Sequence, residues 1–347
     1  MFYFLAFIIA FGLILLLTPL LKRLAFKWGL VDYPDSNRKI HHQPVSLFGG
    51  GAIFLAYFIA LFIFNKDFLA GNLDWSQLLG FFAGALCLMI GGFLDDKYNL
   101  PPYQQIIFPL LAVLSVIIGG VEITKLTNPF GGVIFLQKMF FIGPVLVFFW
   151  LAGMMYTTKL LDGVDGLVTG LGAIGGLIIF LFTLTTRYYQ PDIALASLIL
   201  VAVCLGFLIF NFNPAKMFLG EGGSLLIGYI LGVLAIISGG KMAITLLVMG
   251  IPILDVFWTI IRRLISGRNP FKSADKKHLH HRLLALGLNQ KQTVFVFYGL
   301  ALFFGLSGLF LQSLGKFWAL VVLLFVMLSL VIALSFLSRR PFKQINS

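Results

Sequence analysis

Long apolar runs set the strongest limit on how this chain can fold. A helix needs about 20 residues to cross the hydrocarbon core of a bilayer, and the chain offers about eleven runs of that kind. We therefore predict an all-α polytopic membrane protein, with about eleven transmembrane helices in a single domain over residues 1–347. The expected spans are roughly 2–20, 46–64, 78–94, 103–120, 139–156, 166–186, 192–210, 222–238, 242–261, 292–312 and 317–337.

The amino-acid composition agrees with burial in lipid. Of the 347 residues, 60% are hydrophobic and only 11% are charged, and phenylalanine alone accounts for 38. A soluble domain needs far more polar surface, so the composition excludes ordinary soluble proteins. Cys87 and Cys204 both lie inside apolar runs and have no metal-ligand spacing. This position favours a packing role for each of them.

One segment between the apolar runs has the pattern of strands. Residues 121–137 read VEITKLTNPFGGVIFLQ, with alternating apolar and polar residues around Asn-Pro and Gly-Gly. Alternation is typical of strands, and these residue pairs are typical of turns. We therefore predict a short external β-hairpin near 121–137.

The distribution of basic residues predicts the orientation in the membrane. Of the 25 lysines and arginines, 19 fall on one side of the predicted spans and 6 on the other. Because cytoplasmic loops carry the basic excess, we expect the amino terminus outside and the carboxyl terminus in the cytoplasm. Loop topology and contact with anionic lipid head groups then explain the formal net charge of +12. No nucleic-acid partner is expected.

Carboxylates and histidines gather on the same cytoplasmic side, where nine of the 13 carboxylates and all five histidines lie. The positive-inside bias accounts for lysine and arginine but not for these residues. Ionisable groups at membrane depth are costly and usually serve a function, so we expect the active site to face the cytoplasm. The residues are Asp32, Asp35, Asp95, Asp96, Asp162, Asp165, Glu221, Asp255 and Asp275, with His41, His42, His278, His280 and His281.

Two motifs place acidic residues at the ends of predicted spans. GGFLDDKYNLPP sets Asp95 and Asp96 side by side, which suits a general base or a metal neighbourhood for phosphate chemistry. A solvated acidic helix end is the alternative. KLLDGVDGL places Lys159, Asp162 and Asp165 three residues apart, hence on one face if the segment is helical. The glycines of DGVDG permit a turn and the close approach of a ligand.

Two further motifs add polar groups to the cytoplasmic side. In FNFNPAKMFLGEGGSLLIGY, Asn211 and Asn213 are costly at membrane depth without partners. The glycines around Glu221, followed by a helix, offer backbone N–H groups to an anion. The longest cytoplasmic loop, GRNPFKSADKKHLHHRLL, has three histidines within residues 278–281 among basic residues. This loop predicts a phosphate-binding patch; a metal site and a basic segment on anionic lipid are the alternatives.

Taken in order, the motifs resemble those of the polyprenyl-phosphate N-acetylhexosamine-1-phosphate transferase family. The match runs along nearly the whole chain through RKIHHQPVSLFGGGAIF, GFLDDKYNLPP, LLDGVDGLVTG, FNFNPAKMFLGEGGSLLIG, PILDVFWTIIRRLISGRNPF and HLHHRLL. Six ordered motifs are far more specific than any one of them. The HLHHRLL ending and the eleven expected spans are more similar to the branch that initiates teichoic acid and O-antigen than to the muramoyl-pentapeptide branch.

The resemblance implies an activity, its partners and its location. The implied reaction transfers an N-acetylhexosamine 1-phosphate from a UDP-sugar to undecaprenyl phosphate, with Mg²⁺, and releases UMP. Such a reaction initiates a lipid-linked glycan of the cell envelope. The resemblance also implies a multi-pass protein of a prokaryotic plasma membrane, with its active site facing the cytoplasm, and a homodimer.

Carried over residue by residue, the resemblance implies roles for individual side chains. Asp95 and Asp96 would lie near the lipid phosphate, and Phe218 would stack on the uracil base. The positions implied to be catalytic are Asp95, Asp96, Asp162, His278, His280 and His281. The positions implied to bind substrate are Lys39, His41, Gly163, Val164, Asp165, Asn211, Phe218 and Arg268.

Two residues depart from the family pattern where the family holds its magnesium ion. Lys159 stands where the family usually has asparagine, and Glu221 where it usually has aspartate. Glu221 remains the candidate Mg²⁺ ligand, but an ammonium group offers no oxygen to the metal. Lys159 is therefore expected to form an ion pair with Glu221 or Asp162 in the place of the metal, unless Glu221 tolerates both. Gln105 stands where a basic residue is common.

Three functions stay open on the sequence alone. An active transferase is favoured by Asp95, Asp96, the DGVDG motif, Phe218 and the histidine loop. A catalytically inactive or metal-independent relative, which binds nucleotide sugar or lipid phosphate, is favoured by Lys159 and Glu221. A transporter would show symmetric repeats and helices broken at mid-membrane, and the sequence shows neither.

Overall fold

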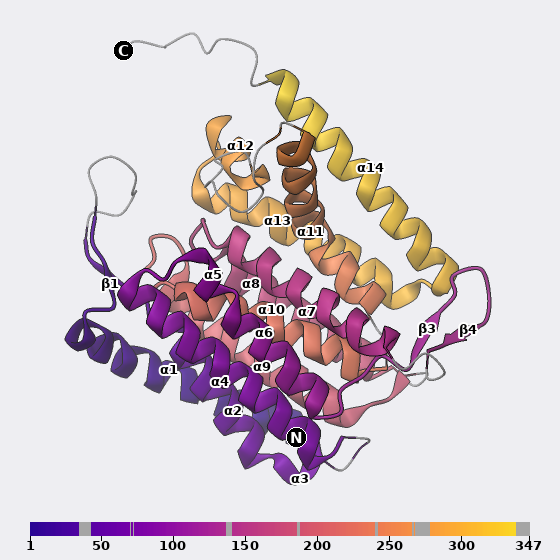
Figure 1. Ribbon diagram of the computed structural model, residues 1–347, viewed down its shortest axis with the longest axis horizontal. Coiled ribbons are helices and arrows are strands. Elements are labelled where there is room, and N and C mark those ends of the chain that lie inside the picture. The colour runs from indigo at the N-terminus through magenta and orange to yellow at the C-terminus, as the bar shows by residue number, and fades with distance from the viewer. Residues whose placement is uncertain are drawn as a thin grey trace.

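Helices form nearly all of the regular structure in the computed structural model, which describes residues 1–34, 43–69, 71, 73–136, 141–185, 188–239, 242–265, 267 and 278–337. Figure 1 shows the long helices packed side by side. The helices are α1 (Phe2–Trp28), α2 (Gly49–Ile63), α3 (Asn65–Phe68), α4 (Trp75–Tyr98), α5 (Pro102–Gln105), α6 (Ile107–Ile118), α7 (Ile142–Leu161), α8 (Leu167–Thr183), α9 (Pro191–Asn211), α10 (Gly220–Ile237), α11 (Met242–Ile265), α12 (Leu279–Ala285), α13 (Gln290–Phe310) and α14 (Ser313–Leu337). The strands are β1 (Val31–Asp32), β2 (Val45–Ser46), β3 (Lys125–Thr127) and β4 (Val133–Phe135).

Within the described ranges, eight helices are long and apolar enough to cross a membrane, namely α1, α4, α7, α9, α10, α11, α13 and α14. Three shorter apolar segments, Gly49–Ile63, Pro102–Ile118 and Leu167–Thr183, coincide with three further predicted spans. The prediction of an all-α polytopic membrane protein is confirmed. The count of eleven spans, the orientation and the single domain stay predictions.

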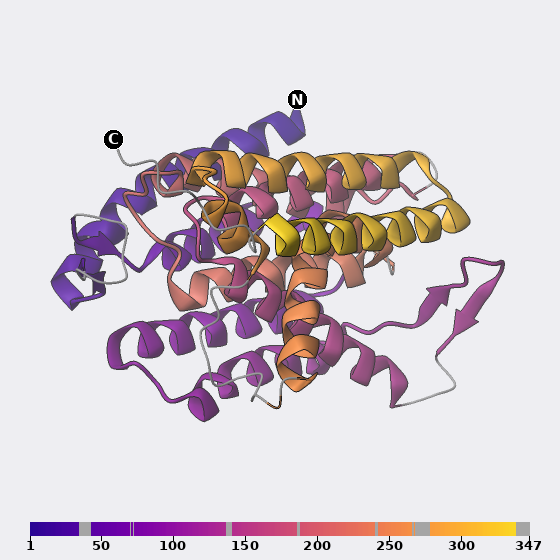
Figure 2. The same cartoon turned by 90° about the horizontal axis from the view of Figure 1, so that it is seen from above.

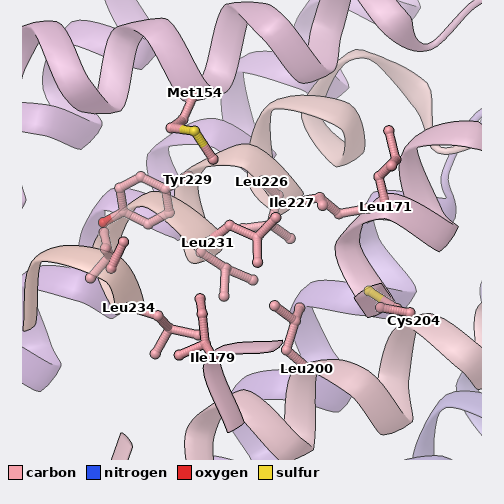
Figure 3. Packing of buried hydrophobic residues seen from close by; sticks show 14 of the residues in the cluster. Met154, Leu171, Ile179, Leu200, Cys204, Leu226, Ile227, Tyr229, Leu231 and Leu234 are labelled. Carbon is pink, nitrogen blue, oxygen red and sulfur yellow. The ribbon is translucent and has the colours of Figure 1, made fainter. Parts of the chain in front are cut away.

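Helix α10 lies at the centre of the packing because it is apolar on every side. Every residue from Gly222 to Ile236 is buried, as expected of a helix without a polar face. In Figure 3, Leu231 of α10 lies among Met154 of α7, Ile179 of α8 and Leu200 of α9. The bundle is therefore built around α10, whose first turn begins at Gly220.

The outermost helices turn large apolar side chains outward. On α1, Phe4 is 70% exposed and Leu16 is 73% exposed, and Phe325 on α14 is 63% exposed. Figure 1 shows α14, in yellow, along one edge of the bundle. Apolar surface on this scale marks contact with a membrane or a partner, and the length of these helices favours lipid as the solvent.

Glycines let three helices meet backbone to backbone. A Cβ atom at Gly50 of α2 would collide with the backbone of Gly223 in α10, and a Cβ atom at Gly92 of α4 would collide with Gly222. Small residues at helix crossings permit this close packing in membrane proteins. The contact sets the last turn of α4 against the first turn of α10.

Two short antiparallel ladders lie outside the helices. β3 pairs with β4, with Lys125 opposite Phe135, so the predicted hairpin is confirmed; Figures 1 and 2 show it projecting from the bundle. β1 pairs with β2, with Val31 opposite Ser46. The sequence did not predict this second ladder, because strands of two residues have no room for a recognisable alternation.

Helix α11 brings a carboxylate to the histidine segment. It contains Pro252, which removes a backbone hydrogen bond from the helix interior. Figure 2 shows its C-terminal part, in orange, running across the direction of α13 and α14. Asp255 lies in the turn after Pro252 and is 2% exposed. This buried carboxylate contacts α12, the helix that carries the histidines.

Candidate active site

A cavity of about 740 Å³ opens where four of the sequence motifs meet. Its walls come from the ends of α1, α4, α7 and α9, from the start of α10 and from adjoining loops. Its size is typical of sites for small molecules and cofactors. Eleven residues that the sequence singled out line it: Asp32, Asp96, Lys159, Asp162, Gly163, Val164, Asp165, Asn211, Asn213, Phe218 and Glu221.

Asp96 faces the N-terminus of α10. The backbone N–H of Glu221 lies 3.2 Å from each carboxylate oxygen of Asp96. The first N–H groups of a helix lack partners within the helix and carry partial positive charge, so the end of α10 sets positive charge against this carboxylate. Gly220 has a φ of 73°, and a Cβ atom there would collide with the carbonyl of Leu47. Glycine at position 220 therefore permits the contact.

Asp95 has a different environment from its neighbour. Its Oδ1 accepts hydrogen bonds from the backbone N–H of Leu100 at 2.9 Å and from Nε2 of Gln105 at 3.1 Å. It is 8% exposed and does not line the cavity. Successive side chains on a helix point about 100° apart, so the pair divides. Asp96 faces the cavity, and Asp95 fixes the turn that follows α4.

Lys159 reaches Glu221 across the cavity wall. In the last turn of α7, its Nζ lies 2.7 Å from Oε2 of Glu221 and 3.1 Å from Oε1 of Gln105. The side chains of Lys159 and Glu221 are 19% and 37% exposed, so the pair is partly screened from water. Of the two ion pairs that the sequence left open, the structure shows the one with Glu221.

The DGVDG loop joins α7 to α8 and carries two carboxylates into the cavity. Oδ2 of Asp165 accepts hydrogen bonds from Nδ2 of Asn213 at 2.9 Å and from the backbone N–H of Ala215 at 3.0 Å. The side chain of Asp162 is exposed within the cavity, but many protein atoms surround it. These surroundings, with the negative charges of Glu221 and Asp165, raise the pKa of Asp162 above the ordinary value of a carboxyl group. Asp165 therefore anchors a loop, while Asp162 faces the ligand space.

Asn211 and Phe218 come from the next motif along the chain and also line the cavity. Asn211 accepts a hydrogen bond from the hydroxyl of Thr169 at 2.7 Å and donates one to the carbonyl of Met217 at 3.0 Å. Its amide therefore shapes the loop before α10. Phe218 is half-buried and lines the cavity. Its backbone N–H donates to the carbonyl of Ser46 at 2.8 Å, which holds the backbone of Phe218 beside the cavity.

The histidine segment lies beside the cavity and outside its lining. Nδ1 of His278 is 2.9 Å from Oδ2 of Asp255, and the backbone N–H of Leu279 donates to Oδ1 of Asp255 at 3.0 Å. A Cβ atom on Gly163 would lie 3.2 Å from Nε2 of His280. The histidines therefore approach the DGVDG loop closely, and Asp255 holds them there.

His280 is the most enclosed of the three histidines. It is 1% exposed, and its ring lies 5.7 Å from that of His278 and 4.2 Å from that of His281. Within the described part of the chain, neither ring nitrogen of His280 has a hydrogen-bond partner. Burial, followed by the nearby rings of His281 and His278, lowers the pKa of His280 to about 3. The ring is therefore neutral at physiological pH, and both of its nitrogens are buried without a hydrogen-bond partner among the described residues.

Some expected site residues fall outside the structure, and some polar residues of the cavity were not expected. Lys39, His41 and Arg268 lie outside the described residues. The cavity is also lined by Lys22, Gln43, Lys216, Ser224 and Gln290. In the sequence, the two lysines of this set are only part of the basic excess, and no local pattern marks the other three. The position of Asp255 in the sequence did indicate a role, since a carboxylate within an apolar run needs a partner.

The geometry at Glu221 does not fit a magnesium ion. Mg²⁺ binds oxygen at about 2.1 Å, so an ion on Oε2 of Glu221 would lie within about 5 Å of the Lys159 ammonium nitrogen. Repulsion between a double and a single positive charge at that distance is about 7 kcal/mol at an effective dielectric constant of about 20. Among the described residues, no three or more His, Cys, Asp or Glu side chains are grouped to hold a metal ion. The expectation of Mg²⁺ finds no support in this arrangement.

Comparison with known proteins gives the same family as the motifs. Residues 78–239 match the family described as glycosyl transferase family 4. The chain is 32% identical to a probable undecaprenyl-phosphate N-acetylglucosaminyl 1-phosphate transferase of Bacillus subtilis, over 93% of this chain and 88% of that protein. It is 30% identical to an undecaprenyl-phosphate α-N-acetylglucosaminyl 1-phosphate transferase of Thermotoga maritima, over 84% of this chain and 86% of that protein. It is also 30% identical to a phospho-N-acetylmuramoyl-pentapeptide-transferase of Staphylococcus saprophyticus, over 88% of this chain and 97% of that protein.

These relatives align with 84–93% of the chain at 30–32% identity. The chain therefore belongs to glycosyl transferase family 4, among the polyprenyl-phosphate N-acetylhexosamine-1-phosphate transferases.

Proposed function

We propose that this protein transfers an N-acetylhexosamine 1-phosphate from a UDP-sugar to undecaprenyl phosphate and releases UMP. The product is the first lipid-linked intermediate of a cell-envelope glycan. The observation that carries the proposal is that Asp96, the DGVDG loop, Phe218 and Lys159 line one cavity of about 740 Å³ at the ends of apolar helices. The names of the relatives in Bacillus subtilis and Thermotoga maritima support the same acceptor and sugar.

In the proposed reaction, a phosphate oxygen of the lipid attacks the phosphorus atom that carries the sugar. The bond from that phosphorus to the bridging oxygen of the diphosphate breaks, and UMP leaves with the bridging oxygen and its electron pair. A new P–O–P linkage joins the lipid to the sugar phosphate. Two dianions give two dianions, so the reaction has no net uptake or release of protons. Positioning and electrostatic stabilisation carry catalysis of this kind.

The geometry suggests which residue serves each part of the substrates. Phe218 is a half-buried aromatic side chain that lines the cavity. The uracil ring can therefore stack on its exposed face. Asp96 faces the cavity and, when the acceptor phosphate arrives singly protonated, takes that proton first so that the dianion attacks, whereas Asp95 is held by Gln105. The neutral ring of His280 lies next to Gly163 and supports the DGVDG loop, which lines the cavity that would receive the donor.

The proposal includes the setting of the reaction. The protein works as a single domain over residues 1–347 in a bacterial plasma membrane, with its cavity toward the cytoplasm, where nucleotide sugars are available. The basic excess on one side of the predicted spans supports this orientation. A homodimer is part of the proposal through the family resemblance alone.

The test is UMP release by purified protein with undecaprenyl phosphate and a panel of UDP-N-acetylhexosamines. We expect release only when both the lipid and a matching donor are present. Asp96→Asn should lower the rate by about 100-fold, because it removes the charge that faces the acceptor. Asp74→Asn is the matched control, since Asp74 caps α4 at its opposite end and is exposed. UMP release that does not depend on the lipid would contradict the proposal.

A further inference from the structure

Lys159 lines the cavity and is held there by contacts with Gln105 and Glu221. We infer that the ammonium group of Lys159, fixed between Gln105 and Glu221, binds the diphosphate of the nucleotide sugar in the place of a divalent metal ion. The inference rests on the proposed function and specifies how the site neutralises its anionic donor.

Three separate helices hold the ammonium group in place. Lys159 comes from the last turn of α7, Gln105 from the end of α5 and Glu221 from the first turn of α10. Nζ lies 2.7 Å from the carboxylate of Glu221 and 3.1 Å from Oε1 of Gln105. An ammonium group has three N–H donors. Among the described residues, Gln105 accepts a hydrogen bond from the group and Glu221 forms an ion pair with it. Lys159 also lines the cavity, so its positive charge lies beside the space for a ligand.

The amide of Gln105 is oriented to receive a cationic donor. Its Nε2 donates to Oδ1 of Asp95 at 3.1 Å and to the carbonyl of Leu100 at 2.9 Å. Both of these partners are acceptors, so they fix Nε2 on their side and leave Oε1 toward Lys159. The buried Asp95 thus supports the ammonium group through Gln105. A chain of contacts from Asp95 to Glu221 is built around one cation.

Lys159 forms an ion pair with the carboxylate of Glu221, which is the group that a metal ion would need as a ligand. The backbone N–H of Glu221 serves Asp96, while its carboxylate is paired with the ammonium group. A divalent ion on that carboxylate would share the immediate neighbourhood of a fixed positive charge and be repelled by it. Phosphate oxygens are attracted to the same ammonium, since lysine is a common phosphate ligand. The arrangement therefore selects an anionic ligand over a metal ion.

The first test compares UMP release by the wild-type protein in Mg²⁺ and in EDTA. The inference expects the two rates to agree within about twofold, because no divalent ion takes part. A loss of more than about tenfold in EDTA, restored by Mg²⁺, overturns it while leaving the proposed transferase activity intact. Lys159→Asn in EDTA should lose about 100-fold, as when one preorganised group is removed from a charged transition state. Wild-type rates for that variant in EDTA would also overturn the inference.

The second test measures metal binding directly and needs no activity. Mn²⁺ is titrated into detergent-solubilised protein and followed by electron paramagnetic resonance. The wild type should show no site at millimolar Mn²⁺, whereas Lys159→Asn and Lys159→Asn/Glu221→Asp should gain one, because the ammonium is gone and oxygen ligands remain. Lys97→Asn is the matched control, since it removes the same charge from an exposed neighbour of Asp96 and should gain none.

The two tests separate failure of the inference from failure of the proposed function. If the wild type releases no UMP under any condition, the proposed function fails and Mn²⁺ binding alone decides the inference. A wild-type Mn²⁺ site that disappears in Glu221→Gln overturns it, and that comparison does not depend on the folding of any Lys159 variant. Lys159→Arg, which keeps the charge, should retain metal independence.

Discussion

The carboxylate of Asp255 joins the histidine segment to α11, since Nδ1 of His278 lies 2.9 Å from one of its oxygens and the N–H of Leu279 lies 3.0 Å from the other. Both residues are buried, at 2% and 6% exposure for Asp255 and His278. A carboxylate buried in a membrane helix without partners is costly. The pair therefore fixes where the three histidines sit relative to the DGVDG loop.

Asp255→Ala should lower kcat/KM for UMP release by about 10- to 100-fold, because hydrogen bonds to a charged group contribute about 1.5–3 kcal/mol each. Asp255→Asn keeps one acceptor and should lose less. The readout is steady-state kinetics alongside the melting temperature. Asp67→Asn, on the short helix α3, is the control for changing an aspartate. Normal kinetics in Asp255→Ala would show that the histidine segment has no part in turnover.

Gly220→Ala should abolish most of the activity and lower the melting temperature. A Cβ atom there would collide with the carbonyl of Leu47 and lie 2.6 Å from Oδ2 of Asp96, in addition to the cost of about 1 kcal/mol for a side chain at positive φ. Gly239→Ala is a matched control, because Gly239 has a φ of 81° but nothing within 4 Å of a Cβ atom. Equal effects of the two substitutions would mean that backbone strain alone, and no contact at the cavity, explains the loss.

Phe218→Ala should raise KM for the UDP-sugar by about 10- to 100-fold, because stacking of a base on an aromatic ring contributes about 1–3 kcal/mol. Phe218→Tyr should restore most of the affinity, since it keeps the aromatic face. Phe130→Ala, on the loop between β3 and β4, should leave KM unchanged. The prediction is wrong if KM is unaffected and only kcat falls.

His280 predicts a loss of stability at acidic pH. Its pKa is about 3 in the folded protein, whereas a histidine in an unfolded chain has a pKa of about 6.5. Between these values the unfolded state binds the extra proton, so stability is lost as the pH falls from about 6.5 toward 3. Each pH unit by which the pH falls within that interval lowers the free energy of unfolding by up to about 1.4 kcal/mol.

The measurement is the melting temperature in detergent at neutral and mildly acidic pH. The wild type should lose about 2–4 °C more than His280→Gln for each pH unit below 6.5. His281→Gln, at a partly exposed neighbour, should keep most of the wild-type slope, because burial is the larger cause of the low pKa of His280. A His280→Gln variant with an unchanged slope would assign the acid sensitivity to other groups.

The helices could be predicted from the sequence because apolar length alone determines them in a membrane protein. The hairpin was predictable for a similar local reason, since its alternation and its turn residues lie within one short segment. Helices α2 and α8 were predicted as spans, although at 15 and 17 residues they are shorter than a typical membrane helix. Their place in the bundle depends on packing against α9 and α10, which local composition does not encode.

The site was predictable as a set of residue types but not as a set of contacts. The adjacent carboxylates Asp95 and Asp96 look equivalent in the sequence, yet only the second lines the cavity, because they point in different directions from one helix. The side chain of Gln290 reaches the cavity from a segment far along the chain. A local sequence pattern cannot show that a residue so far along the chain lines the same cavity. The sequence predicted an ion pair of Lys159 but left its partner open between Glu221 and Asp162, and the structure shows the pair with Glu221.

The backbone contacts of Gly92 with Gly222 and of Gly50 with Gly223 have a consequence for how the lining of the cavity can change shape. Helices that meet backbone to backbone leave no space between them, so a larger side chain at any of these four positions should displace α10 and with it Glu221. Asn213 and Gln290 also line the cavity, and they are joined through their side chains, with Nδ2 of Asn213 donating to Oε1 of Gln290 at 2.8 Å. Substitutions at the glycine contacts should therefore disturb the cavity more than substitutions at Gln290.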